Sequence, residues 1–509
     1  MTSGSIDCTP THHFALRCDD ILTEVFDRVL DPEIHLPPPA RHSHFVISQV
    51  NNQWRGIVLS TPRYWTSYSF TAAQFQDVSE RMDIVIALLK RSRTQLLSFS
   101  FLPRFGQLSG PSLSQAPLRN LLFGAGRIDF FECLVLPYAD RISSLKYIFI
   151  GHGRSNRTTS GLPLNAFRVL KKLDVIYVQT VHNGPTEFSQ ITDDHFFAFK
   201  QAEALRELTC EVVGQPSSFV LLHFPLRHLS KLFIEGIVLS FPYLVQVMQL
   251  CSSTLMEGSF TVELHENAQA AIQRLQRISM ACLDTLCIQV LDASNDPLFA
   301  DSLPQFPILA DLTIKEADRS EPFCWNLEQY FGLVSNCASS LHTFRLADLQ
   351  IDPATGTPVN GYEGDFLHRL DPVRSFADEL EALFRIIPNV VNLSLPLSID
   401  IPPRLLDKIA NGTFLPLLGT LEIGTKSSPA PIFNMVSRRN GLASLSTAIS
   451  SIEYLGLFLP TMLEEEKAHL EKNAGALNLE DGYDFWYVKC CKKEDCQTFC
   501  FLASSPVSE

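Results

Sequence analysis

Four cysteines near the C-terminal end of the sequence are the residues whose types and spacing come closest to a metal or redox centre. Cys490, Cys491, Cys496 and Cys500 follow one another in the pattern C-C-x4-C-x3-C, with no histidine among them. Thiolates bind zinc well, but zinc sites usually separate two ligand pairs by about a dozen residues or more. The spacing therefore favours buried or free thiols, and a metal or redox site is the weaker alternative.

Other residues that could do chemistry have simpler interpretations. Residues 151–155, Gly-His-Gly-Arg-Ser, look like a phosphate-binding loop, but no well-formed helix follows them, so a turn between structural repeats explains the glycines better. His12, His13, His42 and His44 stand beside proline-rich or polar sequence and are expected to be solvated loop residues. The metalloprotease, P-loop and nucleophile-elbow motifs do not occur in the sequence.

The sequence therefore predicts no catalytic residue, no cofactor and no metal site, in a protein that is not an enzyme. An enzyme with an unrecognised site in the repeats is the alternative, weakened because no Ser/His/Asp or Cys/His set converges in the sequence.

The overall composition is that of a folded chain without a basic surface. Hydrophobic residues make up 46% of the 509 positions and charged residues 19%, which is typical of folded rather than disordered protein. The formal net charge of −14 argues against a general nucleic-acid binder, because phosphate contacts require a basic surface. The best apolar stretch, 237–250, is too short for a membrane span and is broken by Pro242. We therefore expect neither nucleic acid nor a membrane as partner.

Cysteine usage and the N-terminal residues indicate a reducing compartment. The 13 cysteines are odd in number and do not form the framework of a small disulfide-rich domain. The first residues lack the basic and then apolar segments of a signal peptide. We expect a cytoplasmic or nuclear protein whose thiols are mostly buried as small hydrophobic groups.

Most of the chain carries one recurring pattern, L-x-x-L-x-L, in which Ile, Val and Phe also occur. Its full and partial copies begin at residues 118, 145, 170, 205, 229, 255, 283, 309, 341, 390, 418 and 452. Most intervals are near the roughly 20–29 residues of a leucine-rich repeat, whose strand points apolar side chains inward before the chain returns through a helix or loop. Another leucine-rich α/β protein would produce a few such matches, but not this many at quasi-regular spacing. The pattern predicts an irregular leucine-rich-repeat solenoid, a horseshoe, over residues 67–460; the copies lack the consensus asparagine.

Local patterns predict further elements. Residues 84–89 are expected to be helical, and residues 96–101 alternate apolar and polar side chains as a strand does. The longest interval between copies holds a Pro/Gly/Asp-rich insertion at 352–364 and a helical run at 376–387. Residues 461–509 form an acidic segment with a charged helix over 464–472 and aromatic residues at 483–487. We expect this segment to cap the solenoid, and a flexible acidic tail is the alternative.

Two short amphipathic segments lie near the N-terminus. The first predicts a helix over residues 19–30, with Asp19 or Asp20 as the N-cap. The proline-rich residues 31–39 cannot be helical, and a second helix is predicted over 45–59, before Pro62. Two such helices are too small to hold a large core. A docking module over residues 14–66 is therefore the better interpretation.

The second segment carries a pattern that resembles a known family. Residues 49–65 read Q-V-x-x-x-W-R-x-I-x-L-S-T-P-R-x-W. This is similar to the F-box of fungal proteins of the mushroom, or basidiomycete, type, and the resemblance covers roughly 50 residues. The F-box is the module that binds the Skp adaptor of cullin–RING ubiquitin ligases. The usual Leu-Pro opening is missing, because Leu16 is followed by Arg17 and Cys18.

The resemblance implies a substrate-recognition adaptor of an SCF-type cullin–RING ubiquitin ligase, in which the F-box-like module docks on the Skp adaptor and the repeats bind an unknown target protein. The residues expected at the Skp adaptor are the apolar ones that line both helices: Ile21, Leu22, Val25, Phe26, Val46, Val50, Trp54 and Ile57. Some of them must hold the module together instead, and the sequence does not divide them. The alternative is a leucine-rich-repeat interaction scaffold that acts outside a ubiquitin ligase.

Overall fold

The chain forms two compact units, residues 1–205 and residues 206–509, in a computed structural model. The structure describes residues 18–36, 38–39, 41–71, 82–102, 134–151, 165–179, 197–213, 221, 224–263, 278–291, 304–317, 325–348, 350–351, 358–359, 376–396, 399–425, 428–460, 464–477, 479, 482–493 and 496–502. In both units, parallel strands pair in chain order and alternate with helices or loops. The predicted α/β class is confirmed, and the parallel strands form an open, solenoid-like arrangement rather than a closed barrel.

The first unit begins with three short helices, α1 (Asp19–Val29), α2 (Ser43–Ser48) and α3 (Asn52–Ser60). The first predicted helix is confirmed, but Cys18 occupies its N-cap, and Asp19 and Asp20 lie in the first turn, where their charge favours the helix dipole. The single helix predicted over 45–59 is wrong. Asn51 interrupts it, because its side chain caps α3 by accepting a hydrogen bond of 2.8 Å from the backbone N–H of Trp54.

The first unit also contains parallel strands, the first of which lies between α1 and α2 and the others after α3. They are β1 (Ile34–Leu36), β2 (Ser67–Thr71), β3 (Leu97–Leu102), β4 (Ile142–Gly151) and β5 (Lys172–Gln179). Between them lie α5 (Met82–Arg91) and the 3-10 turns η2 (Pro62–Trp65) and η6 (Leu136–Arg141), and the 3-10 turn η8 (Phe197–Phe199) follows β5. The predicted strand and helix near residue 90 are confirmed as β3 and α5. Strand β1 was not expected: it lies within the proline-rich residues 31–39 and pairs with β2.

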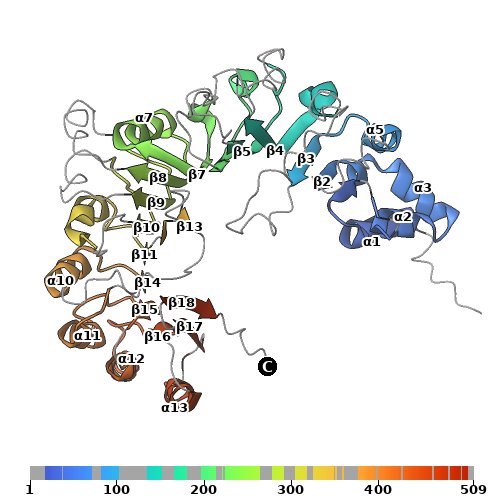
Figure 1. Ribbon diagram of the computed structural model, residues 1–509. Coiled ribbons are helices and arrows are strands. Elements are labelled where there is room, and N and C mark those ends of the chain that lie inside the picture. The colour runs from blue at the N-terminus through green and yellow to red at the C-terminus, as the bar shows by residue number, and fades with distance from the viewer. Residues whose placement is uncertain are drawn as a thin grey trace, which may run out of the picture. The chain divides into compact units, whose positions relative to one another are not determined.

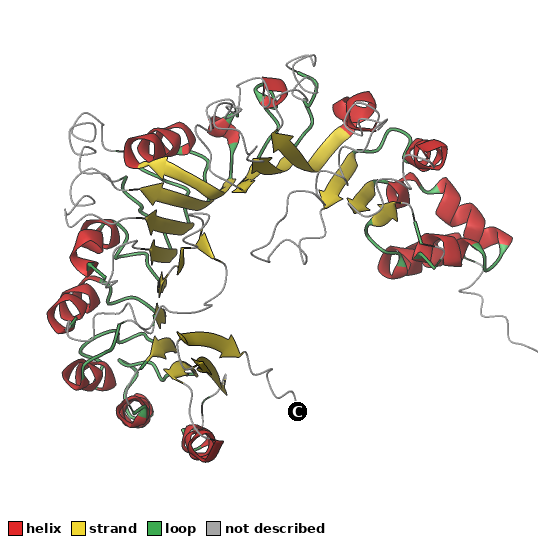
Figure 2. Ribbon diagram, viewed as in Figure 1, coloured by secondary structure: helices red, strands yellow, loops and turns green. Residues whose placement is uncertain are grey.

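The second unit repeats one strand and one return segment many times. Its parallel strands are β6 (Glu207–Val213), β7 (Lys231–Ser240), β8 (Glu257–Glu263), β9 (Thr285–Leu291), β10 (Asp311–Ala317), β11 (Thr343–Asp348), β14 (Asn392–Leu395), β15 (Thr420–Gly424), β16 (Tyr454–Pro460) and β17 (Gly482–Lys493). Its helices are α7 (Phe241–Cys251), α9 (Phe331–Ser335), α10 (Ala377–Ile386), α11 (Pro403–Ala410), α12 (Ala430–Ala443) and α13 (Glu464–Gly475), with 3-10 turns η10 (Leu226–His228) and η11 (Leu327–Tyr330). Helices α7 and α10 to α13 lie on one side of the strands (Figure 1), and the other side carries no helix in the described residues (Figure 2).

The repeated leucines form the core between the strands and the return segments. All three positions of the pattern are buried in the copies Leu229-Leu232-Ile234, Leu283-Leu286-Ile288, Leu309-Leu312-Ile314, Leu341-Phe344-Leu346, Val390-Leu393-Leu395, Leu418-Leu421-Ile423 and Ile452-Leu455-Leu457. One copy departs from the pattern. After Leu255 it has Gly258, where an added Cβ would lie 2.7 Å from the ring of Phe260, so the larger ring takes the space of the missing leucine.

Backbone hydrogen bonds between repeats replace the missing asparagine. The N–H groups of Met256 and Glu257 both donate to the carbonyl of Ser230, at 2.8 and 3.0 Å. Those of Asp284 and Thr285 donate to the carbonyl of Met256 in the same way. A carbonyl oxygen has two lone pairs and can accept both bonds. The accepting carbonyls belong to Arg206, Ser230, Met256, Asp284, Ala310, His342, Val391 and Gly419.

A buried arginine of α12 donates hydrogen bonds to backbone carbonyls of the neighbouring segments. The guanidinium of Arg439 donates to the carbonyls of Ile409, Leu415, Pro416, Leu418 and Ser450 at 2.7–3.2 Å. Its side chain is fully buried, and burial lowers the pKa of Arg439 to about 10. One side chain therefore satisfies carbonyl groups from three separate segments of the chain.

The last segment continues the sheet. Helix α13 lies where the charged helix was expected, and β17 pairs in parallel with β16, so that Tyr483 stands opposite Leu455. Strand β18 (Cys496–Leu502) then pairs with β17 in antiparallel orientation. In a separate antiparallel pair, β12 (Gln350–Ile351) directly precedes the predicted insertion and β13 (Pro358–Val359) lies within it.

Candidate protein-docking surface

The eight residues predicted to dock on a partner divide into two groups by exposure. Three of them are buried: Leu22, Phe26 and Ile57, with 2%, 1% and 8% of their surface exposed. Four of them are exposed: Ile21, Val25, Val46 and Val50, with 44%, 45%, 47% and 56%. Trp54 is intermediate. The structure thus divides the eight residues by exposure.

Helix α1 separates its apolar residues onto two sides. Leu22 and Phe26 are four residues apart and point into the core, whereas Ile21 and Val25 are four residues apart and point to solvent. Val29 continues the solvent stripe and is 55% exposed, although it was not among the residues predicted to dock. The exposed aliphatic residues of α1, of α2 and of the turn after α2 are called the aliphatic set below: Ile21, Val25, Val29, Val46 and Val50.

Trp54 and Arg55, the most distinctive pair in the sequence, hold the helices together. The Trp54 ring meets the ring of Phe26 edge-on, with centroids 5.2 Å apart. The Nε of Arg55 donates to the carbonyl of Ser48 at 2.9 Å and so satisfies a free carbonyl at the end of α2. The pair therefore joins α3 to α1 and to α2.

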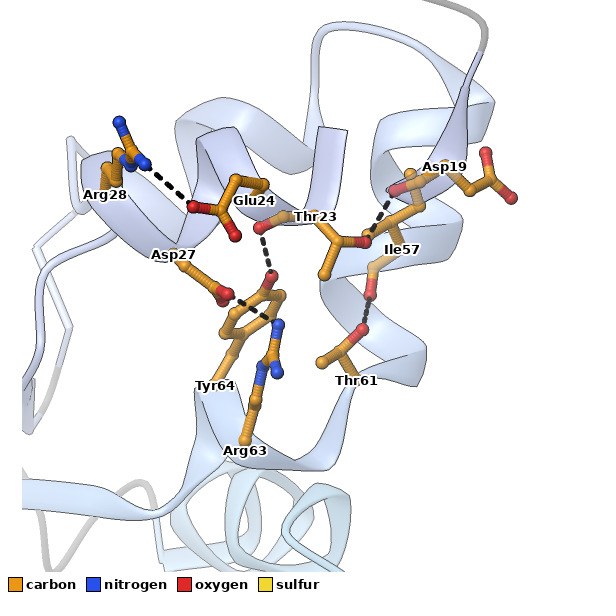
Figure 3. A network of polar contacts seen from close by, with 9 residues as sticks. All are labelled: Asp19, Thr23, Glu24, Asp27, Arg28, Ile57, Thr61, Arg63 and Tyr64. Atoms are coloured by element: carbon orange, nitrogen blue, oxygen red, sulfur yellow. Dashed lines mark hydrogen bonds and ion pairs between the residues drawn. The ribbon is translucent and has the colours of Figure 1, made fainter. Parts of the chain in front are cut away.

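Polar contacts fasten the other side of α1 to the turn after α3. Arg63 forms an ion pair of 2.6 Å with Asp27, and the hydroxyl of Tyr64 donates to the carbonyl of Thr23 at 3.1 Å (Figure 3). At the start of α1, Gln53 donates to the carboxylate of Asp19 at 2.7 Å. These contacts involve the side of α1 away from Ile21 and Val25, so the helix is anchored while its aliphatic stripe stays exposed.

His42 and His44 are not solvated loop residues, and that prediction is wrong. Their exposed fractions are 3% and 1%, and their rings lie 4.9 Å apart between centroids. Nε2 of His44 donates to the carbonyl of Tyr64 at 2.9 Å, and its ring packs edge-on against Trp65. Burial, and then the nearby His42, lower the pKa of His44 to about 4. The rings are buried because α2 starts after His42 and packs onto the turn that carries Trp65.

The metal and redox sites considered from the sequence lie only in part within the described residues. In the described parts of the chain, no group of three or more His, Cys, Asp or Glu side chains could hold a metal ion. In the backbone register of β17 and β18, Cys490 is paired with Phe499, Cys491 with Thr498 and Cys500 with Lys489, so none of these cysteines is paired directly with another. His12, His13 and residues 152–155 lie outside the described residues.

The aliphatic set is the strongest candidate site that these residues offer. Large aliphatic side chains with about half of their surface in water lose little by leaving water and gain by contact with another apolar surface. Nothing in their chemistry binds a small polar ligand or moves a proton. Among the described helices, none is long and apolar enough to cross a membrane. No protein-family model matches this chain, and no curated protein is similar to it in sequence.

Proposed function

We propose that this protein is a non-enzymatic substrate-recognition adaptor of an SCF-type cullin–RING ubiquitin ligase. Helices α1 to α3 dock on the Skp adaptor, and the repeats of the second unit bind a target protein. The F-box-like pattern of residues 49–65 and the exposed aliphatic set support the proposal together. The observation that carries it is the exposure of Ile21, Val25 and Val29 along one side of an anchored helix.

The size of the aliphatic set fits a docking interface. Complete burial of one Val or Ile side chain is worth about 1.5–3 kcal/mol relative to full exposure, and these residues are half exposed. Five of them together can supply the apolar centre of an interface, although association costs offset part of the gain. The anchoring contacts of Asp27 and Thr23 mean that little further ordering of α1 is needed on binding.

Function in this proposal comes from proximity. A target held by the repeats and a ubiquitin-charged enzyme held by the ligase meet at a high effective concentration, without a reacting group from this chain. The cytoplasm or the nucleus is the proposed compartment, since such ligases act there. The second candidate is an interaction scaffold outside a ligase, and the missing Leu-Pro at residues 16–18 favours it.

Affinity purification of the tagged full-length chain from its own cells separates these candidates. The adaptor proposal expects the Skp adaptor and the cullin to co-purify with the wild type and to be lost with the double variant Val25→Asp/Val50→Asp. A matched control is Leu442→Asp/Leu445→Asp, which puts the same charges at two exposed leucines of the second unit, 38% and 85% exposed. Recovery of neither ligase subunit with the wild type would leave only the scaffold.

A further inference from the structure

The strands at the end of the second unit present one side without a helix. In β14 to β17, Leu393, Leu421 and Leu455 are buried against the return segments, and alternate residues point to the opposite side. The outward positions hold half-buried polar residues in two rows that run across the strands: Asn392, Thr420 and Tyr454, and Ser394, Glu422 and Asp484. This group is called the strand face below. It is the sheet surface that the described helices leave uncovered.

The strand face has negative charge and no positive charge. Glu422 and Asp484 are its charged residues, and no Lys or Arg occurs among its outward positions. Earlier in the same unit two carboxylates pair with a basic residue of a neighbouring strand: Glu257 with Lys231 at 2.6 Å, and Asp311 with Arg345 at 3.0 Å. The two carboxylates of the strand face lack such a partner in the described residues.

The cations of the nearby helices are already engaged. On α10 to α12, Arg404 pairs with Asp378, Lys408 with Glu381 and Arg438 with Asp407. These ion pairs lie on the helix side of the strands. Within the described residues, the helices therefore neutralise their own charges and leave those of the strand face uncompensated.

Strand register sets the distance between the two carboxylates. Glu422 and Asp484 both stand beside Gly456, one on each neighbouring strand. Adjacent strands lie about 4.8 Å apart, so the two Cα atoms are on the order of 10 Å from each other. Gly456 puts no side chain between them, but its own surface is buried, so the carboxylates are reached over the half-buried side chains of Glu422 and Asp484. A cationic side chain from another molecule can approach both carboxylates from that side.

Tyr454 adds an aromatic ring to the same place. Its hydroxyl donates to the carboxylate of Asp484 at 2.8 Å. Burial and the negative charges of Asp484 and Glu422 raise the pKa of Tyr454, so the phenol stays protonated and keeps this bond. In the described residues the side chain of Glu422 makes no hydrogen bond and no ion pair, which leaves its carboxylate available to a guanidinium or ammonium group.

We propose that the strand face binds an extended, basic segment of a partner protein, with one Arg or Lys side chain between Glu422 and Asp484. The argument is charge complementarity: an uncovered sheet face with two unpaired carboxylates favours a cation and disfavours an acidic segment. The proposal rests on the proposed function in one respect, since the partner would be the target that the adaptor recruits. Binding of the segment itself does not require the Skp adaptor.

The test is a fluorescence-anisotropy titration of the full-length chain with a labelled peptide of alternating Arg and Ser. In an extended peptide, alternate residues point to one side, so its arginines meet one surface. We expect the Arg peptide to bind more tightly than a Glu/Ser peptide of equal length. Affinity should fall as salt is raised, because exposed charges are screened.

The informative variants change charge without changing shape. Glu422→Gln/Asp484→Asn should lower the affinity for the Arg peptide about tenfold. Each contact to a half-exposed carboxylate is worth under about 1 kcal/mol, and 1.4 kcal/mol corresponds to a factor of ten. Glu422→Gln alone should weaken it about threefold, and it breaks no hydrogen bond of the described fold. The control Asp407→Asn/Glu471→Gln removes the same charge from the helix side and should leave affinity within about twofold.

Each outcome decides the proposal. The proposal is supported if the Glu422 variants lose affinity for the Arg peptide and Asp407→Asn/Glu471→Gln does not. If the strand-face and helix-side variants lose the same affinity, the peptide is attracted generally to a chain of net charge −14, and the proposal is overturned. Equal binding of the Arg and Glu peptides overturns it as well. The Skp adaptor provides the separate readout: Glu422→Gln should bind it like the wild type. Failure of the wild type to bind the adaptor while it still binds the Arg peptide would contradict the proposed function and leave the strand face standing.

Discussion

Trp54 of α3 and Phe26 of α1 meet edge-on, with ring centroids 5.2 Å apart and ring planes at 69°. Phe26 is buried and Trp54 is half-buried, so the contact lies between the two helices rather than on their surface. The residue that makes the sequence pattern most distinctive is thus part of the support for the aliphatic set. Ile21 and Val25, on the outer side of α1, are free to meet a partner.

Trp54→Ala should therefore loosen the helices. We expect local destabilisation of about 2 kcal/mol, less than the 3–5 kcal/mol of a fully buried Trp because this side chain is half-exposed. Hydrogen exchange at the amides of α1 and α3 measures the change. The control Val25→Ala, at a 45% exposed position, should change protection by under about 0.5 kcal/mol. Equal effects of the two substitutions would mean that the Trp54–Phe26 contact does not hold α1.

Arg439 and Arg438 are adjacent in the chain, but we expect substitution of Arg439 to cost much more stability than substitution of Arg438. Arg439→Met leaves several buried carbonyls without a donor and should destabilise the second unit by about 3 kcal/mol or more. Arg438→Met removes an exposed ion pair to Asp407 and should cost under about 1 kcal/mol. Thermal unfolding of both variants gives the comparison. If the two melt together, the buried guanidinium does not organise the repeats around α12.

The lowered pKa of His44 predicts that the first unit loses stability in acid. Its pKa is about 4 when folded and about 6.5 when unfolded, so between these values the unfolded chain binds more protons. Stability from this residue is complete above pH 6.5 and is lost as the pH falls toward 4, by at most about 3 kcal/mol. Unfolding measured from pH 7.5 to 4.5 should show a shallower loss in His44→Phe than in the wild type. His228→Phe, in the second unit, is the control; parallel pH profiles for His44→Phe and the wild type would rule out this origin.

The repeats could be predicted from the sequence because they depend on local periodicity. The spacing of Leu232, Leu286 and Leu312 marks buried strand positions directly, and each is buried. Gly258 escaped the pattern, because only the position of the Phe260 ring explains why a leucine is absent there. The shared carbonyl acceptors that join the repeats carry no side-chain signal at all.

The docking residues could be predicted only as a group. Ile21 and Leu22 are adjacent in the chain and both are apolar. Ile21 is exposed and Leu22 is buried because of the side of α1 that meets α3. The apolar spacing on either side of Asn51 predicted one continuous helix, whereas the side chain of Asn51 caps a separate helix, α3. The burial of His42 and His44 could not be predicted from the residues around them, because it depends on the ring of Trp65, which is distant in the sequence.

The most direct test of the proposed function is a calorimetric titration of the purified full-length chain with a purified Skp adaptor. The proposal predicts binding by the wild type at micromolar concentration or below. It predicts a loss of at least about 100-fold for Val25→Asp/Val50→Asp, because two charges would be forced into an apolar interface, and wild-type affinity for Leu442→Asp/Leu445→Asp. No binding by the wild type, or equal binding by the wild type and the Val25→Asp/Val50→Asp variant, would contradict it.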